Sequence, residues 1–197
     1  MPTDPAYVLA FKEFSRANVD PVNWEAMASE FYGENDRASA ILLGSMVEVT
    51  LEGAIKSLMR RDLKNKEQKE VFDGDAPLST FSAKTKVGFA LGIFGPEVNN
   101  DLYLIRTIRN EFAHSRRVMD FETPTLATVC SNLLVPDWPT RCIPIGIEAR
   151  RIEGSIQFDM SSPKLRFQVA CHTISVRLIE FNLDQSKRSE LGWNSLP

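Results

Sequence analysis

The sequence predicts an all-α fold: a single-domain helical bundle with a small irregular insert near residues 135–161. Apolar residues recur at intervals of three and four in several long segments, which is the spacing of an amphipathic helix. Proline and glycine separate these segments. With 197 residues, 43% of them hydrophobic and 25% charged, the chain can form one core of ordinary size.

The chain divides into three parts. Residues 5–17 predict a short amphipathic helix, and residues 24–32 predict a second one after an Asp-Pro break. We therefore expect N-terminal helices in 1–34, a helical bundle domain in 35–185 and a polar tail in 186–197.

A long helix is predicted from Asp36, a candidate N-cap, to about residue 62. Glu48 and Glu52 lie one turn apart on it. They form either a shared solvent-facing edge or a functional carboxylate pair. The apolar positions of this helix recur at helical spacing: Ala40, Leu43, Val47, Leu51, Ala54 and Leu58.

The next segments alternate between turns and helices. Residues 63–79 are polar and then rich in turn residues, and their Asp-Gly-Asp sequence lacks the register of a calcium-binding loop. A helix with a capped start is expected over 80–93, and the next begins at Pro96 or Asn100 and ends near residue 115.

The C-terminal third contains two further helices and the insert. A helix is expected after Thr123-Pro124 and ends near residue 134, and within the insert 143–160 is ambiguous between strand and helix. A final long helix begins at Ser162-Pro163. Its expected stripe is Leu165, Val169, His172, Val176 and Ile179.

Charge and composition narrow the function classes. The net charge of −3 argues against direct binding of duplex DNA, which usually requires a basic surface. The chain has neither a long uncharged apolar run nor a secretory signal pattern, so we expect a cytoplasmic protein without a membrane span. Three widely spaced cysteines and two histidines predict free thiols and neither a metal site nor a cofactor.

The helix that ends near residue 115 carries the candidate site. Arg106, Asn110 and His114 follow one another at intervals of four and form one polar stripe, in which neighbours can touch. Arg109 lies about 140° around the helix from His114, at the edge of the apolar face. The buried face is expected to contain Leu104, Ile105, Ile108 and Phe112.

These side chains could cleave RNA without a metal. His114 could act as a general base on a ribose hydroxyl, and Arg109 and Arg106 could stabilise the charge that develops on the phosphate. Asn110 could orient the imidazole. The alternative is structural, because an arginine here can equally pair with Glu48 or Glu52 on a neighbouring helix.

Two resemblances to known families bear on whether these residues are catalytic or structural. The run from Arg109 to His114, with Asn110 directly after the arginine, resembles the Arg-x4-to-6-His signature of the HEPN superfamily. That resemblance implies an all-α bundle and, for many members, a metal-independent endoribonuclease whose two motifs face one another in a homodimer. The segments 72–86 and 88–92, with the upstream helix 40–55, resemble the mannitol operon repressor family.

The second resemblance covers residues 35–117 and implies a helical regulatory protein. We therefore expect a mannitol-repressor-like protein that acts through protein–protein contacts, with a homodimer and a regulatory protein partner. The alternative is a HEPN-type endoribonuclease with RNA as substrate and Arg109, His114, Asn110 and Arg106 as its site. The residues alone are consistent with both the regulatory protein and the endoribonuclease.

Overall fold

The computed structural model describes residues 35–59, 63–137, 150–152, 155–157 and 160–190, so the N-terminal helices predicted in 1–34 lie outside the described residues. The described part is a helical bundle with one short hairpin, and the predicted all-α fold class is confirmed. Its helices are α3 (Asp36–Ser57), α4 (Asn65–Phe72), α5 (Phe81–Ala90), α6 (Pro96–His114), α7 (Pro124–Ser131) and α8 (Pro163–Glu190).

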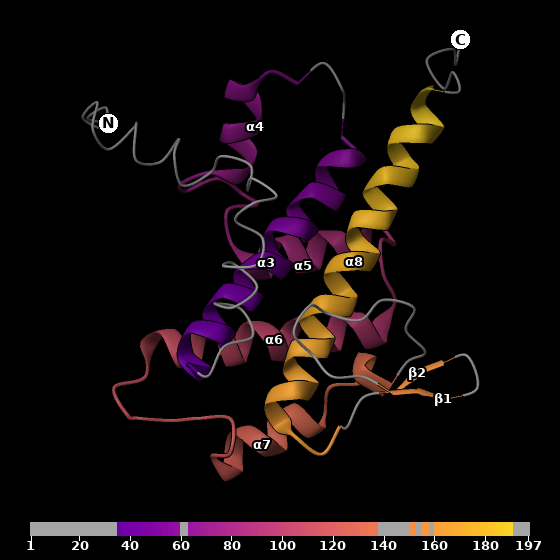
Figure 1. The fold of residues 1–197 in the computed structure, drawn as a ribbon. Coiled ribbons are helices and arrows are strands. Elements are labelled where there is room, and N and C mark those ends of the chain that lie inside the picture. Colours follow the sequence, from indigo (N-terminus) through magenta and orange to yellow (C-terminus); the bar gives the residue numbers. More distant parts are fainter. Residues whose placement is uncertain (1–34, 60–62, 138–149, 153–154, 158–159, 191–197) are drawn as a thin grey trace, which may run out of the picture.

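Helix α3 lies at the centre of the bundle. It runs beside α8 and also packs against α5 and α6, while α7 packs against α8 (Figure 1). Removing the apolar faces of these helices from water is the main force that holds them together. The largest fully buried side chains include Leu43, Leu51, Ile55, Leu102, Ile105, Ile108, Phe112, Phe121, Phe167 and Ile174.

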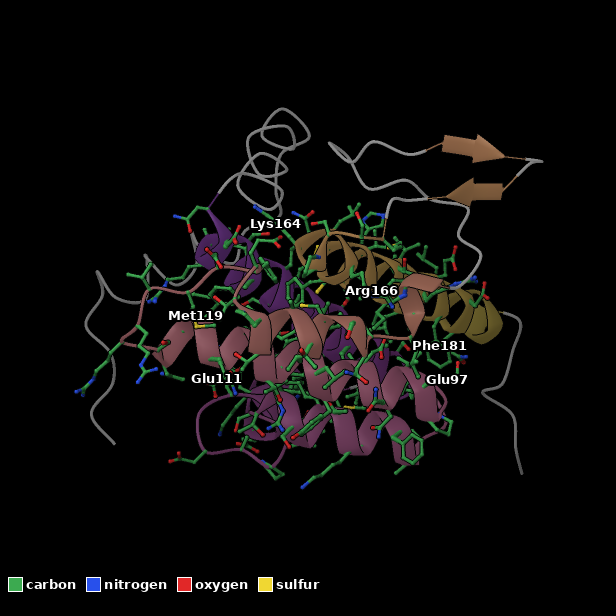
Figure 2. All side chains as sticks on the ribbon, turned by 90° about the horizontal axis from the view of Figure 1, so that it is seen from below. Glu97, Glu111, Met119, Lys164, Arg166 and Phe181 are labelled. Atoms are coloured by element: carbon green, nitrogen blue, oxygen red, sulfur yellow. The ribbon has the colours of Figure 1, made fainter. Side chains whose placement is uncertain are left out.

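Helix α3 begins one residue earlier than predicted. Asn35, and not Asp36, is its N-cap, and the Asn35 side chain accepts a hydrogen bond from the backbone N–H of Ala38 at 3.0 Å. Asp36 instead accepts a hydrogen bond from the N–H of Phe121 at 2.8 Å and pairs with Lys164 at 2.8 Å. Figure 2 shows Lys164 beside the start of α3. The carboxylate therefore ties α3 to two distant segments.

Helix α4 was missed by the sequence analysis, which expected a polar segment without a helix. The helix is short, and Phe72 at its end is its one buried residue. Lys56 of α3 lies 4.7 Å from the centre of the Phe72 ring, a cation–π contact that attaches α4 to the bundle. A single buried side chain gives too little apolar periodicity to predict a helix.

The turn between α5 and α6 follows from local sequence. Thr80 caps α5 by accepting from the N–H of Ala83 at 3.1 Å. The helix ends before Gly92, whose φ of +69° lies in the left-handed region that favours glycine. Gly95 is the N-cap of α6 and Pro96 occupies its first turn, as predicted.

The predicted insert contains a 3-10 turn, η2 (Val135–Asp137), and an antiparallel hairpin of β1 (Arg150–Ile152) and β2 (Ser155–Gln157). Of the ambiguous stretch 143–160, the described residues 150–152 and 155–157 form strands and not a helix. Asp101 of α6 holds the start of η2, because its carboxylate accepts hydrogen bonds from the N–H groups of Leu134 and Val135 at 3.0 and 2.8 Å. Burial raises the pKa of Asp101 although these hydrogen bonds oppose the shift.

Helix α8 buries a different stripe from the predicted one. Val169 is buried, but Ile179 is 47% exposed and Leu165 and His172 are only half-buried. Burial lowers the pKa of His172. Large side chains outside the predicted register, such as Phe167, form the core instead, because α8 contacts both α3 and α7. The observed stripe is Phe167, Ala170, Cys171, Ile174 and Leu178.

Within the described residues, α3 alone is long and apolar enough, by length and composition, to cross a membrane. Many of its residues are buried inside the bundle, and it carries Glu48 and Glu52 in ion pairs with other helices. A buried central helix passes the same test on composition.

Candidate functional site

Arg109 points from α6 towards α3. A Cβ atom built on Gly44 of α3 would lie only 2.8 Å from the Cβ and Cγ atoms of Arg109, so the glycine makes room for the arginine stem. The guanidinium continues along α3 to Glu48, where Nη2 lies 3.3 Å from Oε2. The prediction that Arg109 lies at the edge of the apolar face fits this position, since its side chain is 29% exposed.

Glu48 also belongs to a larger ionic cluster. Lys84 of α5 lies 3.0 Å from Glu48 and 2.8 Å from Glu52, and its own side chain is only 6% exposed. Lys56 completes the cluster with a 2.6 Å bond to Glu52. The solvent-facing edge, one of the two alternatives for these glutamates, is therefore wrong, because Lys84 of α5 pairs with both and Arg109 of α6 pairs with Glu48.

The charges of the cluster stabilise one another. Burial alone would raise the pKa of Glu52, but hydrogen bonds from Lys56 and Lys84 outweigh it and the pKa is lowered. Burial likewise acts to lower the pKa of Lys84, yet the hydrogen bonds that its ammonium donates to Glu52 and Glu48 raise it. Both pKa shifts favour the charged forms of Glu52 and Lys84, and the cluster joins α3, α5 and α6.

The other predicted site residues lie on the outside of α6. Tyr103 (55% exposed), the half-buried Arg106 and Asn110, and the exposed His114 follow at helical spacing and form one surface, called here the α6 outer stripe. The Arg106 guanidinium lies 5.5 Å from the centre of the Tyr103 ring.

The expected contacts along the stripe differ from the observed ones. Asn110 accepts a hydrogen bond from Arg109 Nη1 at 3.1 Å, so the amide faces the ionic cluster. In the part of the chain that the structure describes, no hydrogen bond joins Asn110 to His114 or Arg106. The structure thus brings Arg109 and Asn110 together and leaves His114 at the helix end.

The loop after α6 is held at both ends. Arg37 of α3 donates to the backbone carbonyls of Ser115 and Arg117 at 3.2 and 3.4 Å. The bond from Phe121 to Asp36 fixes its far end. Between these anchors Val118 is fully exposed, and it follows two exposed arginines. The segment 116–118, just beyond the end of α6, is thus exposed to solvent.

The described residues contain no group of three or more side chains that could together bind a metal ion. Burial raises the pKa of Cys130 to about 12 and also that of Cys171, so neither thiol has the low pKa of a nucleophile.

Sequence reasoning did not find Tyr103, Gly44 or the ion pairs of Lys84. Tyr103 lies three residues before Arg106, and extending the polar stripe by one turn would have included it. Lys84 could not have been found in this way, because its partners belong to another helix more than thirty residues away. The role of Gly44 likewise depends on how closely α6 approaches.

The sequence matches no model of a known protein family and no curated protein. The structure, however, is similar to a solved chain described as "X-ray structure of the MtlR-HPr complex from Escherichia coli". The TM-score is 0.51 at 18% sequence identity, over 85% of this chain and 99% of that chain. The chain therefore has an MtlR-like fold, which agrees with the resemblance to the mannitol operon repressor family.

Proposed function

We propose that this chain is a mannitol-repressor-like regulatory protein that acts through protein–protein contacts and not by binding DNA itself. The observation that carries the proposal is its similarity to a protein described in complex with HPr. The HPr protein of the organism that encodes this chain is therefore the first partner to test. A cytoplasmic location and a homodimer, both expected from the sequence, are part of the same proposal.

The α6 outer stripe supports a contact function. Arginine and tyrosine are enriched among the residues that contribute most to protein interfaces, and Arg106 is stacked on Tyr103 in this stripe. This contact restricts the arginine before a partner arrives, which lowers the entropy cost of binding. His114 and the arginines of 116–117 add cations at one end. A partner would meet this surface with carboxylates.

The test is a calorimetric titration of the full chain with HPr. We expect a saturable complex that Arg106→Glu weakens about tenfold or more, because the substitution reverses a charge at the interface. The matched control is Lys69→Glu on α4, an exposed lysine whose charge reversal should leave the affinity within about twofold.

Two outcomes count against this assignment. A wild-type chain that does not bind HPr at tens of micromolar would contradict the proposed partner. Binding that Arg106→Glu and Lys69→Glu reduce equally would place the contact surface elsewhere on the molecule.

The alternative is a HEPN-type endoribonuclease that uses Arg109, His114, Asn110 and Arg106. The observation that favours it is the exposed position of His114 at the end of α6, two residues before two exposed arginines. Against it, Arg109 is already paired with Glu48 within the chain. In a homodimer, His114 of the second copy could lie close to the Arg109–Glu48 pair of the first.

An RNA cleavage assay tests the alternative. A nuclease that uses this site should lose at least about a hundredfold in rate in His114→Ala, as expected for loss of a general base. His172→Ala is the matched control, since His172 lies on α8 and is absent from the proposed site. Equal cleavage by wild type and His114→Ala would contradict this alternative.

A further inference from the structure

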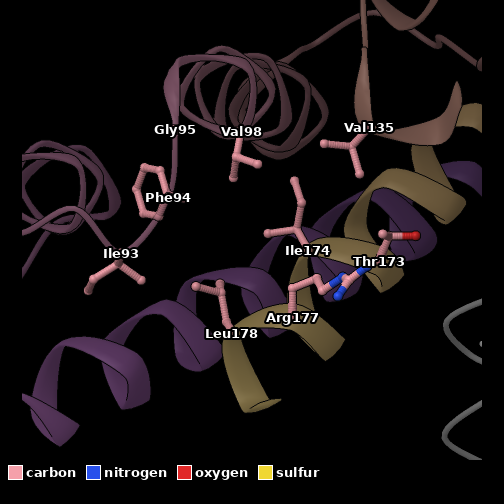
Figure 3. Close-up of a pocket in the computed structure, with 9 residues that line it drawn as sticks. All are labelled: Ile93, Phe94, Gly95, Val98, Val135, Thr173, Ile174, Arg177 and Leu178. Carbon is pink, nitrogen blue, oxygen red and sulfur yellow. The ribbon is translucent and has the colours of Figure 1, made fainter. Parts of the chain in front are cut away.

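An apolar pocket of about 250 Å³ lies where the α5–α6 turn meets α8 (Figure 3). The turn contributes Ile93 and Phe94, and Val98 follows on the first turn of α6. Ile174 and Leu178 close the opposite side from α8, and Val135 of η2 adds a further wall. Most of the lining is hydrocarbon.

The polar groups of the pocket gather at one side. Figure 3 shows the Thr173 hydroxyl and the Arg177 guanidinium at one end, whereas Ile93 and Phe94 lie at the other. Arg177 pairs with Glu180 at 3.6 Å, but both side chains are more than half exposed. Such an exposed pair is weak, so a better-placed anion can compete for the guanidinium.

We propose that this pocket binds a small amphipathic anion: an aliphatic chain with one terminal carboxylate. Since a water-sized group occupies roughly 30 Å³, the pocket holds roughly eight such groups, which is the chain of a medium-length fatty acid. The aliphatic chain fills the end lined by Ile93, Phe94 and Leu178. The carboxylate accepts hydrogen bonds from Arg177, whose planar fork suits its two oxygens.

The hydrophobic effect and the charge act on different parts of this ligand. Apolar surface that is open to water in the empty pocket would be covered by the chain, which favours binding. Arg177 then selects a carboxylate over an alcohol of the same length. The pocket uses the first turn of α6 and lies apart from the α6 outer stripe, which begins at Tyr103.

Octanoate is the test ligand and 1-octanol its uncharged control, titrated calorimetrically into the full chain. We expect one octanoate per chain, with an affinity that Arg177→Gln weakens about tenfold, while octanol binds wild type and Arg177→Gln equally. Lys69→Gln removes an exposed charge on α4 and should leave both affinities unchanged.

Methyl NMR shifts locate the ligand without any substitution. Octanoate should shift the methyl groups of Val98, Ile174 and Leu178, and leave that of Val49, exposed on α3, in place. No saturable binding, or shifts outside the pocket, would overturn the assignment. An octanoate affinity unchanged in Arg177→Gln would overturn the role of the arginine.

Discussion

Gly44 of α3 and the stem of Arg109 on α6 occupy adjoining space, so that a Cβ on the glycine would lie 2.8 Å from two arginine carbons. The close approach allows the guanidinium to reach Glu48 on the same helix as the glycine. Arg109 thus acts as a link between α3 and α6. A residue selected from the sequence as a candidate catalyst has a structural role in the described chain.

Gly44→Ala should therefore destabilise the protein. The new methyl group would push α6 from α3 or force Arg109 out of its conformation, at a cost of about 1–3 kcal/mol. Gly53→Ala is the matched control on the same helix, where the nearest atom is an ordinary contact at 3.5 Å. It should stabilise the protein by about 0.5–1 kcal/mol, as usual for alanine in a helix. Urea unfolding measures both, and equal effects would contradict the close approach.

Lys84→Met should cost about 2–3 kcal/mol of stability, because it leaves Glu48 and Glu52 partly buried with too few cations. Lys86→Met, two residues along the same helix and exposed, should change the free energy of unfolding by less than about 0.5 kcal/mol. A double-mutant cycle with Glu52→Gln should show coupling. Additive effects would mean that the two charges do not interact.

The pH dependence of stability should reveal the lowered pKa of Glu52. A carboxylate whose pKa is lower in the folded than in the unfolded chain stabilises the fold above its ordinary pKa of 4.5. That contribution disappears as the pH falls through the folded-state value. The stability difference between wild type and Glu52→Gln should therefore be constant near pH 7 and shrink below pH 4.5. A difference that grows on acidification would contradict the assignment.

The two buried thiols should be unreactive in the folded protein. Burial raises the pKa of Cys130 to about 12 and that of Cys171 as well, so little thiolate is present at pH 8. Cys142 lies outside the described residues, and a Cys142→Ser variant removes it from the assay. A thiol reagent should modify neither remaining cysteine until denaturant is added. Rapid modification of either in the native state would contradict their burial.

The sequence was sufficient for helices whose apolar residues recur at helical spacing or whose first turn carries a clear start signal. The long helix of Leu43 and Leu51 is confirmed, although it ends at Ser57 and not near residue 62. The capped start at Thr80 and the proline start at Pro96 are also confirmed. These features depend on neighbours within one or two turns, which a sequence displays directly. Helix α4 lacks such a pattern, and its attachment through Phe72 depends on Lys56 of another helix.

The candidate site was predictable only in part. The spacing of Arg106, Asn110 and His114 predicted a shared stripe, and the structure places all three on one side of α6, with His114 exposed and the other two half-buried. The helical spacing also predicted that Arg109 and His114 lie on different sides of the helix. The sequence offered Glu48 and Glu52 as partners for an arginine of this helix, but only helix packing shows that Arg109 pairs with Glu48.

The contact role of Arg106 is tested most directly by comparing Arg109→Gln with Arg106→Glu in stability and in HPr affinity. We expect Arg109→Gln to lower the free energy of unfolding and to leave the affinity of the folded protein within about twofold. We expect the reverse for Arg106→Glu, with unchanged stability and an affinity about tenfold lower or more. An Arg106→Glu variant that binds HPr as well as wild type, or a wild-type chain that does not bind HPr, would contradict this contact role.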